Sequence, residues 1–141
     1  MDPEFADTIL AIVRSRDRLI RSIEEIIRGV GLSEPQFNVL RILRGAGEAL
    51  PTSEVGRRMV TRVPDITRLV DRLEKMGLVC RKRAPEGDRR VVLVEITDQG
   101  LETIAPLDNV LEKHAEKMFS GLSAKDRSQL VGLLDRVGRP E

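Results

Sequence analysis

Apolar residues recur at spacings of three and four along most of this chain, and two short β-prone runs interrupt the pattern. The helical spacing predicts helices over residues 9–30, 34–43, 53–60 and 64–76, and two more after residue 97. Strands are predicted at Leu78–Arg83 and Val91–Ile96, joined by a loop with turn-forming residues. The pattern indicates a mainly α fold with a small β-hairpin, which is an α+β protein.

Residues that prefer helix ends mark several of these boundaries. The following are expected to cap helix N-termini: Ser33, Thr97, Ser123 and, for the short third helix, either Thr52 or Ser53. Pro64 fits the first turn of the fourth helix, and Gly77 fits the left-handed position after its C-terminus. Gly56 favours close approach of the fourth helix to the third. Pro106 should bend or break the long helix after residue 97.

Length and composition indicate one domain of a cytoplasmic protein. The chain has 141 residues, of which 40% are hydrophobic and 33% charged, and no apolar run approaches the ~18 residues of a membrane span. A single cysteine excludes an internal disulfide and agrees with a reducing cytosol. With three Phe and no Tyr or Trp, stacking on single-stranded nucleic acid is disfavoured. Residues 1–5 (MDPEF) resemble a cloning remnant.

Positive charge is concentrated around the fourth helix and the hairpin. Residues 57–90 hold 11 Lys and Arg against 5 Asp and Glu, a local charge of +6, whereas the whole chain carries only +1. Such a concentration is typical of phosphate binding, although the same charges could simply solvate an exposed helix and hairpin. The order of a basic helix followed by a charged hairpin favours duplex DNA.

The terminal helices, over residues 6–31 and 98–141, carry more apolar surface than residues 32–97 can cover. Surface of this kind is normally buried against a partner, and the simplest partner is a second copy related by a two-fold axis. We therefore expect a homodimer, with the alternative that these helices pack back onto their own domain. A dimer would place two recognition helices about 34–36 Å apart on a palindromic duplex.

No enzyme chemistry is indicated. The sequence contains no phosphate-binding glycine motif and no nucleophile motif, so we expect no catalytic residue, no cofactor and no metal site. Cys80 is interpreted as a small strand residue, although the basic residues after it could lower a thiol pKa if the thiol were exposed. His114 has no second His or Cys nearby and is interpreted as an ordinary helical residue.

Three motifs follow one another in a characteristic order: Thr67–Val79 (TRLVDRLEKMGLV), Asp88-Arg89-Arg90, and Thr97–Gly100 (TDQG). In this order the chain resembles the MarR family of bacterial and archaeal winged helix-turn-helix transcriptional regulators, over about residues 9–137. The resemblance implies a winged helix-turn-helix DNA-binding unit over residues 32–97. It also implies a dimerisation region formed by the N- and C-terminal helices.

The resemblance also implies roles for particular side chains. Residues 52–60 would be the first helix of the helix-turn-helix, and Pro64–Met76 the recognition helix in the major groove. Asp88 would orient a wing arginine rather than contact DNA, or it may with Arg90 only stabilise the hairpin. The side chains expected at the DNA are Thr52, Ser53, Arg62, Asp65, Thr67, Arg68, Arg72, Lys75, Arg89 and Arg90.

Family members often respond to small phenolic or other anionic aromatic ligands that bind between the dimerisation helices and the winged unit. The resemblance therefore implies a repressor released by such a ligand, whose binding residues the sequence does not indicate. The alternative from another class is a winged helix that binds proteins and does not read DNA. The basic face of the fourth helix favours DNA, because an apolar interface would not need it.

Overall fold

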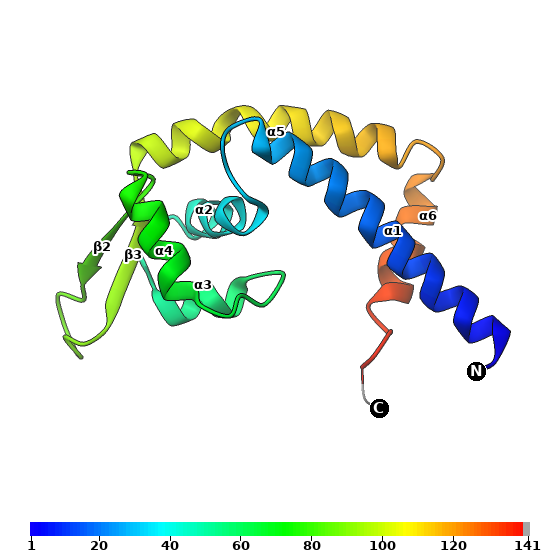
Figure 1. Ribbon diagram of the computed structural model, residues 1–141, viewed down its shortest axis with the longest axis horizontal. Coiled ribbons are helices and arrows are strands. Elements are labelled where there is room, and N and C mark those ends of the chain that lie inside the picture. The colour runs from blue at the N-terminus through cyan, green and yellow to red at the C-terminus, as the bar shows by residue number, and fades with distance from the viewer. Residues whose placement is uncertain (140–141) are drawn as a thin grey trace. The chain divides into compact units, whose positions relative to one another are not determined.

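The computed structural model describes residues 1–139 of the chain (Figure 1). Its elements confirm a mainly helical fold with a small antiparallel sheet. Two compact units are distinguished, one comprising residues 1–107 and the other beginning at Asp108, and α5 runs from the first into the second. The elements are α1 (Pro3–Arg28), α2 (Glu34–Ala46), β1 (Leu50–Pro51), α3 (Thr52–Arg58), α4 (Ile66–Lys75), β2 (Val79–Arg83), β3 (Val92–Ile96), α5 (Asp98–Met118) and α6 (Ala124–Leu134).

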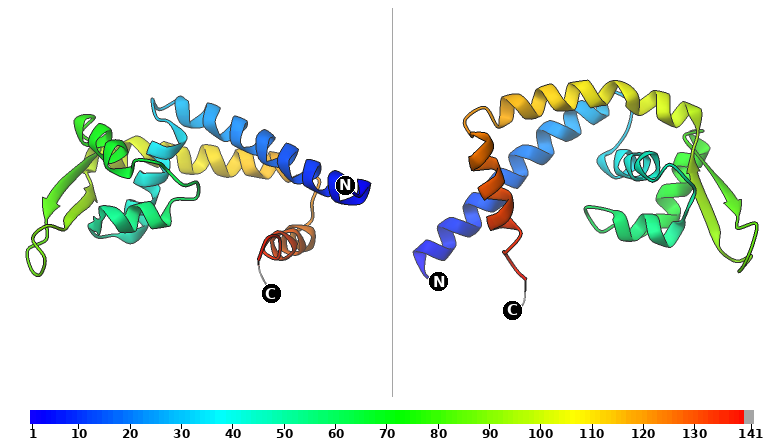
Figure 2. Two further views of the ribbon diagram at one scale, coloured as in Figure 1. Left: turned by 60° about the horizontal axis from the view of Figure 1, so that its bottom comes forward. Right: turned by 180° about the vertical axis from the view of Figure 1, so that it is seen from behind.

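The sheet has three strands in the order β1-β3-β2, all antiparallel. Strands β2 and β3 form the predicted hairpin, with Val79 opposite Ile96 and Arg83 opposite Val92. The sequence did not indicate β1, whose residues Leu50 and Pro51 pair with Val94 and Leu93. Two residues are too few to show a strand pattern, and proline is tolerated there because β1 is an edge strand. Strands β2 and β3 project from the helices as a wing (Figure 2).

The core of the first unit is built around α2, which packs against α1, α3, α4 and β3. Its apolar side chains fill the space that these elements enclose, and the fully buried residues include Ile27, Val39, Leu40, Leu43, Val55, Val70, Leu73, Val94 and Ile104. Each large aliphatic side chain buried in this way contributes about 1.5–3 kcal/mol. This core holds α3, α4 and the sheet in fixed relation to one another.

The end of α4 and the start of α5 are joined by a tight set of contacts. Gly77 has the predicted left-handed conformation, with φ 78°. Thr97 caps α5 as predicted: its Oγ1 accepts the Gly100 N–H (3.1 Å) and donates to the Gly77 carbonyl (2.7 Å). A Cβ on Gly100 would collide with the carbonyl oxygen of Leu78. A glycine is therefore required where α5 passes Leu78.

Two helices are longer than predicted. Helix α1 begins at Pro3 rather than at Ile9, because Asp2 caps it by accepting the Glu4 N–H at 2.9 Å. Residues 3–5, set aside in the sequence analysis, thus form its first turn. Helix α2 has the predicted Ser33 cap but continues to Ala46, and its glycine with positive φ is Gly47.

The long helix α5 is not broken by Pro106, which lies within its span of 21 residues. Of the two outcomes expected for this proline, a break is therefore wrong. Helix α6 begins with the predicted capping box, in which Ser123 and Asp126 each accept the other's backbone N–H. It ends at Leu134, so Val137 lies beyond the helix.

Two helices leave large apolar side chains in contact with solvent. In α1 these are Phe5, Ile9, Leu10 and Val13, and from α6 to the following turn they are Leu130, Val131, Leu133, Leu134 and Val137. Within residues 1–139, no helix combines the length and apolar character needed to cross a membrane.

Candidate nucleic-acid interface

Helix α3 begins directly after β1, and this changes the predicted cap. Neither Thr52 nor Ser53 is the N-cap, because Pro51 holds that position in extended conformation and offers no side-chain hydrogen bond. The pairing of β1 with β3 keeps the chain extended up to Pro51. Thr52 instead uses its Oγ1 to donate a hydrogen bond to the carbonyl of Val92 in β3 (3.4 Å), and Ser53 is exposed.

Helix α4 begins two residues later than predicted. Pro64 precedes the helix rather than lying in its first turn, because Asp65 is the N-cap and its Oδ1 accepts the Arg68 N–H at 3.0 Å. Asp65 was predicted to face DNA, and the structure places its carboxylate at the N-terminus of α4, where a negative charge stabilises the helix.

Helix α3 and α4 are in contact as predicted from Gly56. A Cβ at this position would lie 3.7 Å from the Ile66 side chain, which is ordinary van der Waals contact. The two helices are therefore neighbours, but their packing leaves room for a methyl group. The packing of α3 against α4 therefore does not require a glycine at position 56.

The exposed face of α4 and the segment before it carry cations without intramolecular partners. Within the described part of the chain, Arg62, Arg68 and Arg72 are exposed and form no hydrogen bond or ion pair through their side chains. Lys75 is also exposed, but its Nζ lies 3.2 Å from Asp71. Arg68, Arg72 and Lys75 follow one another at intervals of four and three, so they share one side of the helix, opposite the buried Val70 and Leu73. An anion approaching this face would meet them together.

The wing loop carries the second group of cations. Asp88 accepts hydrogen bonds from the backbone N–H (3.0 Å) and the Nε (3.1 Å) of Arg90, and the Arg90 side chain holds the pKa of the Asp88 carboxyl below its usual range. This contact fits both roles expected for Asp88, orientation of a wing arginine and stabilisation of the hairpin. Arg89 is exposed and its side chain has no partner in the described part of the chain, while its carbonyl accepts Arg83 Nη1 at 3.0 Å.

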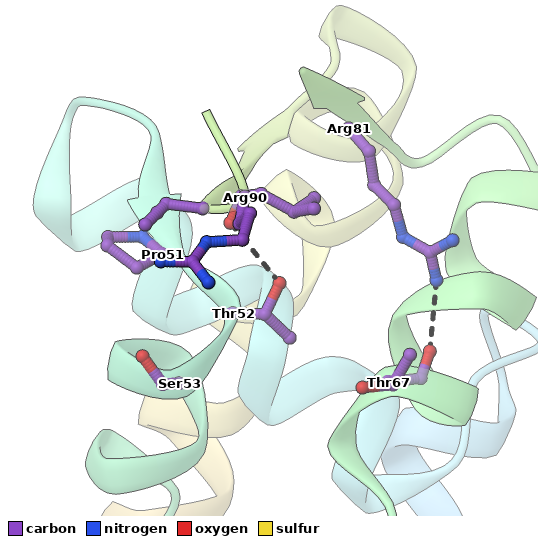
Figure 3. A pocket seen from close by; sticks show the side chains of 8 residues that line it. Pro51, Thr52, Ser53, Thr67, Arg81 and Arg90 are labelled. Carbon is purple, nitrogen blue, oxygen red and sulfur yellow. Dashed lines mark hydrogen bonds between the residues drawn. The ribbon is translucent and has the colours of Figure 1, made fainter. Parts of the chain in front are cut away.

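A cavity of about 360 Å³ lies between the wing and the helices (Figure 3). It brings together predicted site residues from α3, α4 and the wing, and it is lined by Pro51, Thr52, Ser53, Thr67, Arg81, Arg90, Val91 and Val92. Its polar groups are hydroxyls and the guanidiniums of Arg81 and Arg90, both of which pair with carboxylates.

The sequence analysis did not assign a role to Arg81. Its Nη2 donates to the carbonyl of Thr67 at 3.0 Å (Figure 3). Its Nη1 lies 3.5 Å from Asp71 and 3.9 Å from Glu74. The only signal available was its basic character in a β-prone run, which did not distinguish it from Lys82 and Arg83. Its partners are brought to it by the fold.

Other charges near the interface are paired on the surface. Glu54 of α3 forms ion pairs with Arg57 and Arg58, and the hydrogen bond from Arg58 lowers the pKa of the Glu54 carboxyl. Lys82 donates to Glu95 across the hairpin (2.7 Å), which raises the pKa of Lys82. Among the residues described on this part of the surface, the cations without an intramolecular partner are therefore Arg62, Arg68, Arg72 and Arg89.

Within residues 1–139, no group of three or more His, Cys, Asp or Glu side chains is arranged to hold a metal ion. Cys80 is exposed on β2. His114 lies in α5, in the unit that begins at Asp108.

Comparison with known proteins places these features in a family. The family model described as "MarR family" matches residues 32–92. The chain is 30% identical to the HTH-type transcriptional repressor IacR of Pseudomonas putida, over 89% of this chain and 74% of that protein. The MarR transcription factor from Planctomyces limnophilus has a similar structure, with a TM-score of 0.69 and 38% identity over 92% of this chain and 94% of that one.

Two further solved structures are similar along nearly the whole chain. The transcriptional repressor CouR, bound to a 23-mer DNA duplex, is 28% identical with a TM-score of 0.78, covering 92% of this chain and 90% of its own. BpsR of Bordetella bronchiseptica, whose DNA binding is regulated by 6-hydroxynicotinic acid, is 25% identical with a TM-score of 0.80, covering 93% and 92%. These relatives are named as regulators of transcription and not as enzymes.

Proposed function

The chain belongs to the MarR family of transcriptional regulators, and on that basis we propose that it binds a specific sequence in double-stranded DNA. Helix α4 lies in the major groove, where Arg68 and its neighbours contact base edges and phosphates. The wing places Arg89 or Arg90 at the adjacent minor groove, whose negative potential attracts a cation. Thr52, Ser53 and Thr67 line the cavity, and from there they contact the DNA backbone between the two grooves.

The observation that carries this proposal is the distribution of unpaired charge. Arg62, Arg68, Arg72 and Arg89 are exposed and lack intramolecular partners within residues 1–139, whereas the cations of α3 and the middle of the wing are paired with carboxylates. These unpaired arginines, just before and along α4 and at the wing tip, are available to an anionic partner that meets both elements.

The active form in this proposal is a homodimer on a palindromic site. The apolar side chains that α1 and α6 leave exposed are suited to burial against a second copy. A two-fold axis then presents two α4 helices to successive turns of the major groove, about 34–36 Å apart.

The regulator acts in the cytoplasm as a repressor released by a small molecule. IacR and CouR are both named as repressors, and DNA binding by BpsR is regulated by an aromatic acid. We therefore propose a phenolic or other anionic aromatic effector for this chain. Such a ligand can shift DNA binding only by having different affinities for the two states of the dimer.

The experiment is selection of a duplex from a random-sequence library, followed by binding measurements as salt is varied. Phosphate contacts make the affinity fall steeply with salt, by about 0.9 in the logarithmic slope for each phosphate neutralised. Arg68→Ala should cost about 1–3 kcal/mol and relax specificity at one base pair per half-site. Arg28→Ala in α1 is the control, because it removes an exposed arginine that pairs with Glu24 and lies outside the proposed DNA-contacting surface.

The results separate the proposal from its alternative. If no duplex is enriched at low salt, the DNA-binding proposal is wrong and the alternative, a winged helix that binds proteins, is favoured. If a duplex is enriched but Arg68→Ala binds it like the wild-type protein, DNA recognition stands and the role of Arg68 is wrong.

A further inference from the structure

We propose that Arg81 is a positioning residue that holds the recognition helix α4 and the wing at a fixed angle, so that both meet DNA together. The inference rests on the proposed DNA-binding function and deepens it. It gives a role to a side chain that lines the cavity between the two elements and whose charge is paired within the chain.

The contacts of Arg81 all lead from the wing strand β2 to α4. Its guanidinium donates to the Thr67 carbonyl (3.0 Å) and lies near Asp71 and Glu74. Its backbone N–H donates to Glu74 Oε2 at 2.8 Å. One residue of β2 is thus bound at three positions along α4, from its first turn to its last.

The strand places this side chain precisely against the helix. Alternate residues of a strand face opposite sides of the sheet, so Arg81 shares a side with the buried Val79. The Arg81 side chain is 26% exposed, whereas Lys82 is 50% exposed and pairs with Glu95 of the neighbouring strand. Arg81 therefore joins β2 to α4, and Lys82 joins β2 only to β3.

The shape of the group matters as much as its charge. A guanidinium presents several N–H donors in one rigid plane, so it can bind a carbonyl and two carboxylates at once, which an ammonium group does less well. The carbonyl that it holds belongs to Thr67, the residue next to Arg68. A shift of this first turn would move Arg68 relative to the bases.

The charge of Arg81 is already balanced by its neighbours. Asp71 and Glu74 both lie within 4 Å of the guanidinium, so Arg81 has less to offer a phosphate than the unpaired arginines of α4. A positioning role and a phosphate contact therefore make different predictions. Loss of a phosphate contact lowers the salt dependence of binding, and loss of a positioning contact lowers specificity without changing that dependence.

The test compares Arg81→Gln with Lys82→Gln, which removes the same charge from the same strand. Affinity is measured for the selected duplex and for a scrambled duplex of equal composition, over a range of salt. Arg81→Gln should weaken binding to the selected duplex about tenfold, with a much smaller loss on the scrambled one and an unchanged salt slope. Lys82→Gln should weaken both duplexes equally and leave their ratio as in the wild-type protein.

Asp71→Asn gives a second test, in which the sign of the effect is informative. Removing a negative charge from the DNA-facing region should tighten binding to both duplexes equally if charge alone matters. If Asp71 acts by holding Arg81, the ratio of selected to scrambled affinity should fall instead. The double variant should then have the same ratio as Arg81→Gln, because both changes break one connection.

The outcomes separate this inference from the function on which it rests. If the wild-type protein selects no duplex, the proposed function fails and the inference fails with it. If a duplex is selected but Arg81→Gln keeps the wild-type ratio, or lowers the salt slope by about 0.9, only the positioning role is overturned. If Arg81→Gln does not fold, Arg81→Lys decides: it keeps the charge without the planar fork, and a wild-type ratio there also overturns the role.

Discussion

Helices α2 and α6 place their apolar residues in opposite ways. Helix α2 buries six of its residues among α1, α3, α4 and β3. Helix α6 buries none, although it has a well-formed capping box and five leucine, valine or alanine side chains within its span. Helix α2 is therefore stabilised by tertiary packing. In the single chain, helix α6 is stabilised mainly by its own hydrogen bonds.

This difference shows which parts of the molecule a single chain can complete. The core around α2 needs no second copy, so the arrangement of α3, α4 and the wing is specified within one chain. A short helix with no packing is marginal in water. In the proposed function, helix α6 is stabilised by packing against a second copy.

The largest expected effect comes from opening the core around α2. Leu40→Ala removes a fully buried side chain and should lower the free energy of unfolding by about 2–5 kcal/mol, measured by denaturant titration. Val131→Ala in α6, where the side chain is 60% exposed, is the comparison and should change it far less in the monomer. Equal losses would show that α6 is packed within its own chain.

The next effect is on association rather than on the fold. Leu133→Glu places a charge where α6 exposes a leucine, and a buried unpaired charge should raise the dimer dissociation constant about 100-fold. Ser128→Glu adds the same charge to the same helix without removing an apolar side chain, so it should leave the dimer intact. Sedimentation at several protein concentrations measures both. A dimer unaffected by Leu133→Glu would place the interface elsewhere.

A smaller effect distinguishes the two capping boxes. Ser33→Ala removes the cap of α2 and should cost about 1 kcal/mol of global stability, because α2 unfolds only with the core. Ser123→Ala removes an equivalent bond from α6. In the Leu133→Glu background it should speed amide hydrogen exchange in α6 and leave the global transition unchanged. If the global unfolding transition shifted, α6 would unfold together with the core, contrary to this prediction.

The smallest expected effect is a dependence on pH. The backbone hydrogen bond from Ser123 lowers the pKa of the Asp126 carboxyl below its ordinary value of 3.8. A carboxyl with a lowered pKa stabilises the folded state above its unfolded pKa, and this contribution is lost as the pH falls through the folded pKa. The helicity of α6 in wild-type protein should therefore exceed that of Asp126→Asn above about pH 4, and the two should converge in more acidic solution. A gap that persists at low pH would exclude ionisation as its cause.

Features that depend on local chemistry could be predicted from the sequence. Ser33, Thr97 and Ser123 cap their helices as expected, and Gly77 has the expected left-handed conformation. Each depends on residues within a few positions along the chain. The start of α4 could also have been predicted, because Asp65 is a residue type that strongly favours the N-cap position. The prediction placed the start at Pro64 instead.

Features that depend on distant partners could not be predicted. Strand β1 is defined by pairing with residues more than 40 positions away, and that pairing also explains why Thr52 bonds to Val92 instead of capping α3. Arg81 faces α4 only because β2 folds back along the helix. The predicted DNA-contacting residues remain predictions, although the structure brings Thr52, Ser53, Thr67 and Arg90 to one cavity.

The collision that any Cβ on Gly100 would have with Leu78 sets how the first turn of α5 can move. Because Gly100 has no side chain, the backbone of α5 packs directly against Leu78, just after α4. Thr97 Oγ1 is hydrogen-bonded to Gly77 on one side of this contact and to Gly100 on the other. This contact leaves no space for the two segments to move toward each other. We therefore expect a rotation of the first turn of α5 to move the end of α4 with it.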